Sequence, residues 1–232
     1  MKHIVKQALL SLGIFAVAQG AMASGAAIIG DAKAGAAKAA VCGACHGVDG
    51  NSLAANFPKL AGQGERYLLK QLNDIKEWDA ETDPAKKPTT GRAVLEMTGL
   101  LANLTEQDLA DVAAYFASQN TQLSGSKKME VQVNSGLKVD ALELGTKTYR
   151  AGNMAVGIPA CTGCHGPDGK GNAAAGFPRL SGQHPDYIEK QLTNFRAGNR
   201  VNDGDTMIMR SIADKLSDAE IKALANFIAG LN

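Results

Sequence analysis

Aromatic side chains are scarce in this chain of 232 residues, since they make up 5% of it and include a single tryptophan. Aromatic residues supply much of the apolar volume of protein cores, so this content is low for building a core. Charge of one sign is also lacking, because 24 Lys and Arg face 23 Asp and Glu. Such a balance excludes the basic footprint of a nucleic-acid-binding protein. With only four cysteines, the chain does not resemble the cysteine-dense, disulfide-bonded scaffolds of short secreted proteins.

Long apolar runs are also absent outside the N-terminus. There, the basic residues Lys2 and Lys6 precede an apolar run over 8–18, and Ala21-Met22-Ala23 is a small-x-small cleavage site. The pattern predicts a signal peptide over 1–23, cleavage after Ala23 and export of a mature chain that begins at Ser24. An uncleaved membrane anchor is the alternative, but the run is shorter than the roughly 20 residues of a transmembrane helix.

All four cysteines lie in two copies of one motif. The copies are Cys42-Gly43-Ala44-Cys45-His46 and Cys161-Thr162-Gly163-Cys164-His165, and C-x-x-C-H is the attachment signature of a c-type haem. Two thiols at this spacing lie on one side of a helical turn, where they can add to two vinyl groups of one porphyrin. The histidine that follows can supply a proximal ligand to the iron.

We therefore predict two haem c groups, each attached through two thioethers and each with an axial histidine. Each buried porphyrin would also supply apolar bulk that the aromatic residues do not. The predicted attachment residues are Cys42, Cys45, Cys161 and Cys164, and the predicted axial histidines are His46 and His165.

Other sites that use C-x-x-C fit this sequence less well. A redox dithiol is expected at the start of a helix within a βαβ pattern, and no strand-rich segment flanks either copy. A structural zinc site would need both cysteine pairs on one metal ion, yet more than a hundred residues separate them.

An internal repeat organises the chain. Phe57-Pro58-Lys59-Leu60 is matched by Phe177-Pro178-Arg179-Leu180, and Gly62-Gln63 is matched by Gly182-Gln183. A repeat of about 120 residues exceeds the roughly 20–50 residues of solenoid repeats and indicates a duplicated domain. We expect an N-terminal domain over 24–120, a linker over 121–139 and a C-terminal domain over 140–232.

Both halves have helical patterns, which predict an all-α fold. Apolar residues follow helical spacing over 64–78 and 185–197, and Ala-rich or apolar segments at 31–40 and 142–150 open the two halves. Ser217 and Glu220 form a capping-box pattern before the last helix. The segment from Trp78 to Thr90 occurs in the first half alone, and we expect it to be a surface loop.

The repeat also places a methionine in each half. Met97 lies seven residues before Leu104, and Met209 lies seven residues before Leu216. A thioether opposite histidine is the ligation that raises a cytochrome's potential, so we predict Met97 and Met209 as the second axial ligands. Filling of an apolar core is the alternative role for a methionine. Met207 competes with Met209, but has no counterpart in the first half.

The prolines and several other repeated residues have expected roles near the iron. A ligating histidine donates its other ring N–H to a fixed acceptor, and we predict the carbonyls of Pro58 and Pro178 as these acceptors. Simple turn prolines are the alternative. The paired residues Tyr67 and Tyr187 could pack on a haem edge, and Arg92 and Arg200 could meet a propionate, although ordinary structural roles fit equally well. His184 has no counterpart, and we expect it at the surface.

With these motifs, the chain resembles the cytochrome c4 family of dihaem periplasmic cytochromes. The resemblance covers essentially the whole mature chain. It implies two tandem class I cytochrome c domains, each α-helical around one covalently bound haem, with His and Met ligands at both irons. It further implies that the first and last helices of each domain cross near Gly35 and Gly145, with aromatic partners at Tyr115 and Phe227. Both haems are expected near the domain interface.

The resemblance implies an electron carrier without a catalytic site. Redox partners of such a carrier would include a cytochrome bc-type or other donor and a haem–copper terminal oxidase, with loose association to the inner membrane. The alternative is a dihaem electron-accepting subunit of a sulfur-oxidising flavoenzyme, or a dihaem oxidoreductase, and an oxidoreductase such as a peroxidase would need an iron that is open or can open.

Overall fold

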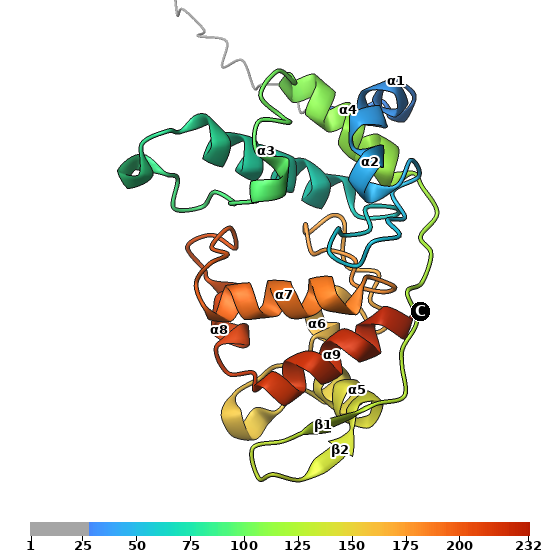
Figure 1. Cartoon of the computed structure of the whole chain (residues 1–232), viewed down its shortest axis with the longest axis vertical. Helices are drawn as coiled ribbons and strands as arrows, with labels where there is room; N and C mark the ends of the chain where they lie inside the picture. The colour runs from blue at the N-terminus through green and yellow to red at the C-terminus, as the bar shows by residue number, and fades with distance from the viewer. Residues whose placement is uncertain (1–27) are drawn as a thin grey trace, which may run out of the picture.

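The computed structural model describes residues 28–232, and the predicted signal peptide lies outside them. Two helical domains lie one above the other (Figure 1). The N-terminal domain contains α1 (Ala32–Lys38), α2 (Gly43–His46), α3 (Glu65–Ala80) and α4 (Glu106–Ala117). The C-terminal domain contains β1 (Glu130–Gln132), β2 (Lys138–Asp140), α5 (Ala141–Ala151), α6 (Thr162–His165), α7 (Pro185–Arg196), α8 (Ile208–Ala213) and α9 (Asp218–Gly230). Short 3-10 turns at 39–41, 84–86, 95–97 and 154–156 complete the described elements.

The first and last helices of each domain pack against each other at a glycine. α1 packs on α4 and α5 packs on α9. A methyl group on Gly35 would overlap the backbone carbonyl of Asp111, and one on Gly145 would overlap that of Ala223. Tyr115 and Phe227 contribute the next nearest side chains at the two crossings, which confirms the expected contacts.

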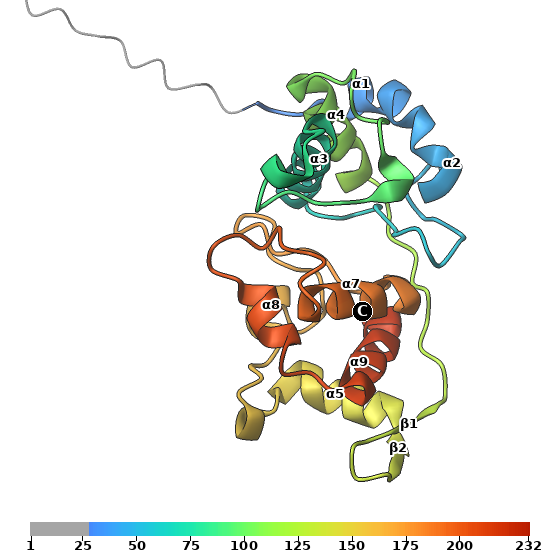
Figure 2. The ribbon, with the colours of Figure 1, turned by 60° about the vertical axis from the view of Figure 1, so that its left-hand side comes forward.

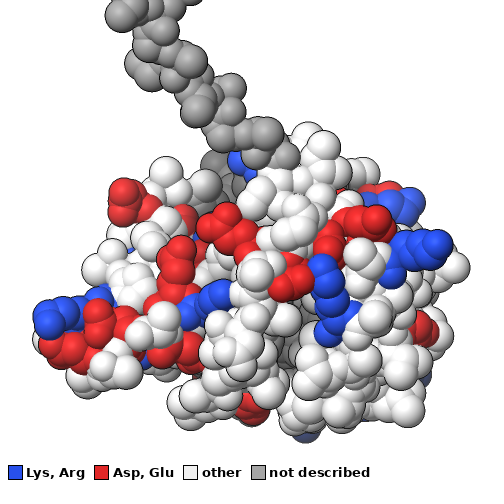
Figure 3. Space-filling model, turned by 90° about the horizontal axis from the view of Figure 1, so that it is seen from above, with Lys and Arg blue, Asp and Glu red and all other residues white. Residues whose placement is uncertain are grey.

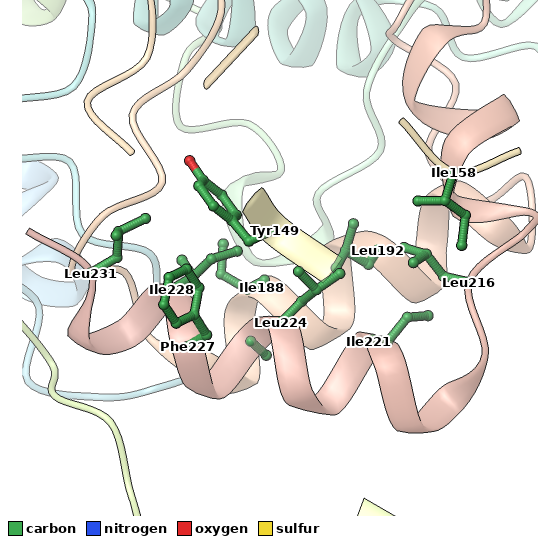
Figure 4. Close-up of a cluster of buried hydrophobic side chains, with 11 residues drawn as sticks. Tyr149, Ile158, Ile188, Leu192, Leu216, Ile221, Leu224, Phe227, Ile228 and Leu231 are labelled. Atoms are coloured by element: carbon green, nitrogen blue, oxygen red, sulfur yellow. The ribbon is translucent and has the colours of Figure 1, made fainter. Parts of the chain in front are cut away.

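The core of the C-terminal domain forms between α5, α7 and α9. Tyr149 and Phe227 pack with ring centroids 5.3 Å apart, and Ile221, Leu224 and other apolar side chains from α9 line the same cluster (Figure 4). The predicted capping box at Ser217 and Glu220 starts α9. A second capping box, formed by Thr105 and Asp108, starts α4, so both last helices begin in the same way.

The structure adds a two-stranded antiparallel sheet to the predicted helices. β1 pairs with β2 at the end of the segment expected to be a linker, with only Asp140 beyond it, and Val131 lies opposite Val139. Val131 is buried against Ala141, Ala219 and Ala223 of the C-terminal domain. Strands of three residues show little alternation in a sequence, and for this reason the helical patterns alone missed the hairpin.

The remaining chain between the domains is hydrogen-bonded to both of them. The Thr121 hydroxyl donates to the carbonyl of Ala61, and the Gly125 N–H donates to that of Ala229. The expected loop from Trp78 to Thr90 is shorter in the structure because α3 continues to Ala80. The Lys87 ammonium bonds to the Trp78 carbonyl and lies over its ring, which folds this loop back on α3.

None of the described helices has the length and apolar character that a membrane crossing requires. The turned view shows α3 in the upper domain and α7 in the lower domain near the boundary between the two (Figure 2). Acidic and basic side chains are interspersed on the face seen from above (Figure 3), in keeping with the near-neutral composition.

Candidate haem sites

Each cysteine pair lies on a single helical turn that ends at the histidine. α2 follows Cys42 directly and ends at His46, where Gly47 leaves the helix with φ of 78°. α6 repeats this geometry from Cys161 to His165. In the first pair Cys42 is half-buried and Cys45 is exposed, so one thiol faces the domain and the other lies at its surface. Burial raises the pKa of Cys161 to about 11.

Both histidines are buried and donate from Nδ1 to a proline carbonyl. The His46 Nδ1–H donates to the Pro58 carbonyl at 2.9 Å, and that of His165 donates to the Pro178 carbonyl at 3.0 Å. Burial lowers the pKa of each histidine, although the proline carbonyl opposes this shift. The hydrogen bond fixes the proton on Nδ1, so that Nε2 is the nitrogen that can bind a metal.

The N-terminal domain contains a cavity of about 410 Å³. His46 and Met97 both line it, and its apolar walls include side chains of α3 and α4 such as Leu68, Ile75 and Phe116. The volume falls within the roughly 300–1,000 Å³ range of ligand and cofactor pockets. The structure therefore brings the predicted cysteines, histidine and methionine of this half to one largely apolar cavity.

In the C-terminal domain, two of the predicted residues lie at the core. Met209 and Cys161 are partly buried and pack on the same apolar cluster. Met207 is 46% exposed and begins α8 with a left-handed backbone. The structure thus places Met209, rather than Met207, on the inner side of the domain.

Two glutamines of the repeat cross the domain boundary in a reciprocal manner. Gln183 accepts from the Lys59 N–H and donates to the Lys59 carbonyl, both at 2.9 Å. Gln63 makes the same two bonds to Arg179, at 2.7 and 2.9 Å. The two domains are therefore joined by equivalent contacts on either side of a pseudo-two-fold axis.

The paired tyrosines and arginines form a second cross-domain network. Arg200 donates to the Tyr67 hydroxyl, and Arg92 donates to the Tyr187 hydroxyl, at 3.0 and 2.9 Å. Arg200 is buried, and within residues 28–232 neither guanidinium forms an ion pair with a carboxylate. Burial acts to raise the pKa of Tyr67, but the nearby Arg200 and Arg92 outweigh it and lower that pKa.

The expectation that His184 lies at the surface is wrong. His184 is buried at the domain boundary, where it contacts the Ser52 carbonyl at 2.9 Å and the Ser124 hydroxyl at 3.1 Å. The equivalent position in the first half is Gly64, and the repeat therefore gave no partner from which to infer a role. The only hint in the sequence was that His184, a polar residue, directly follows the repeated Gly-Gln pair.

The residues at these sites fit a covalently bound haem. In the N-terminal domain, two thiols, an imidazole and a thioether line one largely apolar cavity. Arg92 and Arg200 also line it and have no carboxylate partner among the described residues. Buried cations need counter-charges, and the carboxylates of a porphyrin would supply them.

A comparison with protein families finds two tandem matches. The family model described as cytochrome c matches residues 32–120 and again residues 143–232. Cytochrome c4 of Azotobacter vinelandii is 56% identical over 232 residues, which is 100% of both chains. The thiosulfate dehydrogenase electron acceptor of Thiomonas intermedia is 31% identical over 192 residues, covering 82% of this chain and 78% of that protein.

Solved structures show the same arrangement. The crystal structure of reduced recombinant cytochrome c4 from Pseudomonas stutzeri aligns with a TM-score of 0.79 at 56% identity, and the match covers 88% of this chain and 100% of that one. This match and the two family matches confirm the prediction of two tandem cytochrome c domains.

Proposed function

Because this chain belongs to the cytochrome c4 family of dihaem electron-transfer proteins, we propose that it carries electrons in the periplasm from a cytochrome bc-type complex, or another donor, to a haem–copper terminal oxidase. It is an electron carrier rather than an enzyme, and it holds two covalently attached haem c groups. Redox proteins are its partners. Loose association with the inner membrane would bring it close to both the donor complex and the terminal oxidase.

The equivalent placement of histidine and methionine in the two domains is the observation that supports this role most. His46 and Met97 line one cavity, and Met209 and the attachment cysteine Cys161 pack against one apolar cluster in the other domain. Bound haem supplies the one-electron chemistry. The chain would hold each haem through a histidine and a methionine, with apolar walls and a fixed hydrogen bond to each histidine, and these features would set the potential.

Export is proposed from the N-terminal sequence. Residues 1–23 have the basic, apolar and small-residue regions of a signal peptide, and covalent attachment of haem outside the cytoplasm agrees with this. Sequencing the N-terminus of the periplasmic protein tests the proposal: we expect Ser24 as the first residue, whereas a chain that retains residues 1–23 would contradict it.

The partner assignment is tested with membranes of the producing organism. Pre-reduced protein mixed with these membranes should be reoxidised in air, and cyanide, which blocks haem–copper oxidases, should stop the reaction. Addition of quinol with cyanide present should instead reduce the protein. Membranes that neither oxidise nor reduce it would contradict the proposed pathway.

A second candidate role is that of an electron-accepting subunit in sulfur oxidation. Its support is the 31% identity to a protein named as the electron acceptor of a thiosulfate dehydrogenase. Purification of the native protein under mild conditions distinguishes the two roles. A stable complex with a flavoprotein or a thiosulfate-oxidising partner favours the subunit, and recovery of the free chain favours the mobile carrier.

A further inference from the structure

The peptide bond between Pro58 and Lys59 is hydrogen-bonded at both of its ends. Its carbonyl accepts from the His46 Nδ1–H at 2.9 Å, and its N–H donates to Oε1 of Gln183 at 2.9 Å. Gln183 belongs to the other domain. A single planar peptide unit thus lies between the predicted axial histidine of the N-terminal domain and a glutamine of the C-terminal domain.

The reverse arrangement holds for the C-terminal domain. The carbonyl of the peptide between Pro178 and Arg179 accepts from the His165 Nδ1–H at 3.0 Å, and its N–H donates to Oε1 of Gln63 at 2.7 Å. Both glutamines are 8% exposed. The peptide that accepts from each histidine is therefore hydrogen-bonded to a side chain of the opposite domain.

Both glutamines are fixed by further bonds. Oε1 of Gln63 also accepts from the Gly64 N–H at 2.9 Å, and that of Gln183 accepts from the His184 N–H at 3.0 Å. These N–H groups directly precede α3 and α7. Each side-chain amide is consequently held at the start of one helix while it binds the histidine loop of the opposite domain.

Hydrogen bonds in series through a peptide unit polarise one another, and low local dielectric strengthens them. An acceptor at the peptide N–H therefore makes the carbonyl at the other end a better acceptor for the histidine N–H. A carbonyl that binds a ligating histidine in this way raises the basicity of the ligand. A more basic imidazole stabilises the more highly charged, oxidised iron, which lowers the reduction potential.

We propose that Gln63 and Gln183 are positioning residues that lower the reduction potential of the haem in the opposite domain, by orienting and polarising the peptide that accepts from its histidine. The inference rests on the proposed function, in which His46 and His165 ligate iron. The reduction potential of each haem then depends on the contact with the other domain as well as on its own ligands.

The test is a redox titration of two isosteric variants, Gln183→Met and Gln63→Met, as full-length haem-loaded protein. We expect Q183M to raise the potential of the N-terminal haem alone and Q63M to raise that of the C-terminal haem alone. Each shift should correspond to a several-fold change in the ratio of oxidised to reduced haem. The Met97→Ala and Met209→Ala variants assign the two waves, and Gln107→Met, at an exposed glutamine of α4, serves as the unshifted control.

The His46 Nδ1–H resonance gives an independent measurement. In Q183M it should move in the direction of a weaker hydrogen bond, while that of His165 stays in place. Shifts confined to the mutated domain, equal shifts of both waves, or no shift would each overturn the proposal.

If Q183M does not fold, Gln183→Glu and Gln63→Glu replace the pair, since each keeps an acceptor for the peptide N–H. Each should lower the potential of the opposite haem more than that of its own domain, and the reverse ranking would overturn the proposal. A wild-type protein that lacked two reversible waves would instead contradict the proposed electron-carrier function.

Discussion

Met97 and Met209 differ from the other methionines of the described chain in their surroundings. Both are partly buried against apolar clusters, whereas Met154 is 77% and Met207 is 46% exposed. Replacement of Met209 by alanine should lower the potential of one haem by a sizeable part of the roughly 0.8 V that axial ligands span, because the thioether favours the reduced iron.

Met207→Ala is the matched control for this change, two residues away in the same segment. Redox titration of both variants measures the effect. A lower haem potential in Met207→Ala, together with an unchanged potential in Met209→Ala, would assign the ligand to Met207.

His184 gives the domain boundary a dependence on pH. Burial lowers its pKa from the ordinary value of 6.5, and the nearby Lys59 lowers it further, while Asp186 and the Ser52 carbonyl oppose the shift. As the pH falls below 6.5, the unfolded chain takes up this proton before the folded one, so the stability contributed here is lost. Above pH 6.5 both states are neutral, and the contribution no longer changes.

Thermal unfolding of the haem-loaded protein between about pH 5 and 8 measures this effect. The unfolding midpoint of wild type should fall more steeply below pH 6.5 than that of His184→Gln, which keeps a polar side chain without a titrating ring. Parallel curves for the two proteins would show that His184 is not responsible.

At the scale of elements, the crossing of α5 and α9 depends on Gly145. A methyl group there would overlap the Ala223 carbonyl of α9, so the two helices would have to separate. Gly145→Ala should destabilise the protein by about 1–3 kcal/mol or more, despite the better helix propensity of alanine. Lys147→Ala, at an exposed position of α5, should change stability by less than about 0.5 kcal/mol.

Denaturant unfolding followed by circular dichroism compares these two variants. Equal stabilities would mean that the helices adjust without cost at the crossing, and that close backbone contact is not what Gly145 provides.

The elements that the sequence predicted are those with strong local signals. α3, α7 and α9 have apolar residues at helical spacing over 12 or more residues, and α9 also has a capping box. The hairpin of β1 and β2 was missed because each strand has three residues. Its stability comes from Val131 packing on α9, a contact between segments far apart in the sequence.

At the scale of the molecule, the C-terminal domain helps to form the cavity of the N-terminal domain. Arg200 and Gln191 line that cavity although they belong to the other domain. A ligand set can be proposed for each half because Cys, His and Met recur at equivalent positions of the repeat, and both sets stay predictions. The cross-domain contacts could not, since the repeat shows that Gln63 and Gln183 are equivalent but not that each binds the opposite half.

Arg200 provides a prediction at this scale. Its guanidinium lies beside the N-terminal cavity, and loss of a nearby positive charge favours the oxidised iron. Arg200→Met should therefore lower the potential of the N-terminal haem, as measured by redox titration. Arg196→Met is the control, because Arg196 pairs with the exposed Asp218 within its own domain, and it should leave that potential unchanged.

We propose that both irons are closed by two protein ligands, as an electron carrier requires. Exposure of the dithionite-reduced protein to carbon monoxide tests it most directly, with the methionine-to-iron absorption band of the oxidised protein as a second measurement. We expect no carbon monoxide complex at either haem and a methionine band from both. Carbon monoxide binding to one or both haems of the native protein would contradict it.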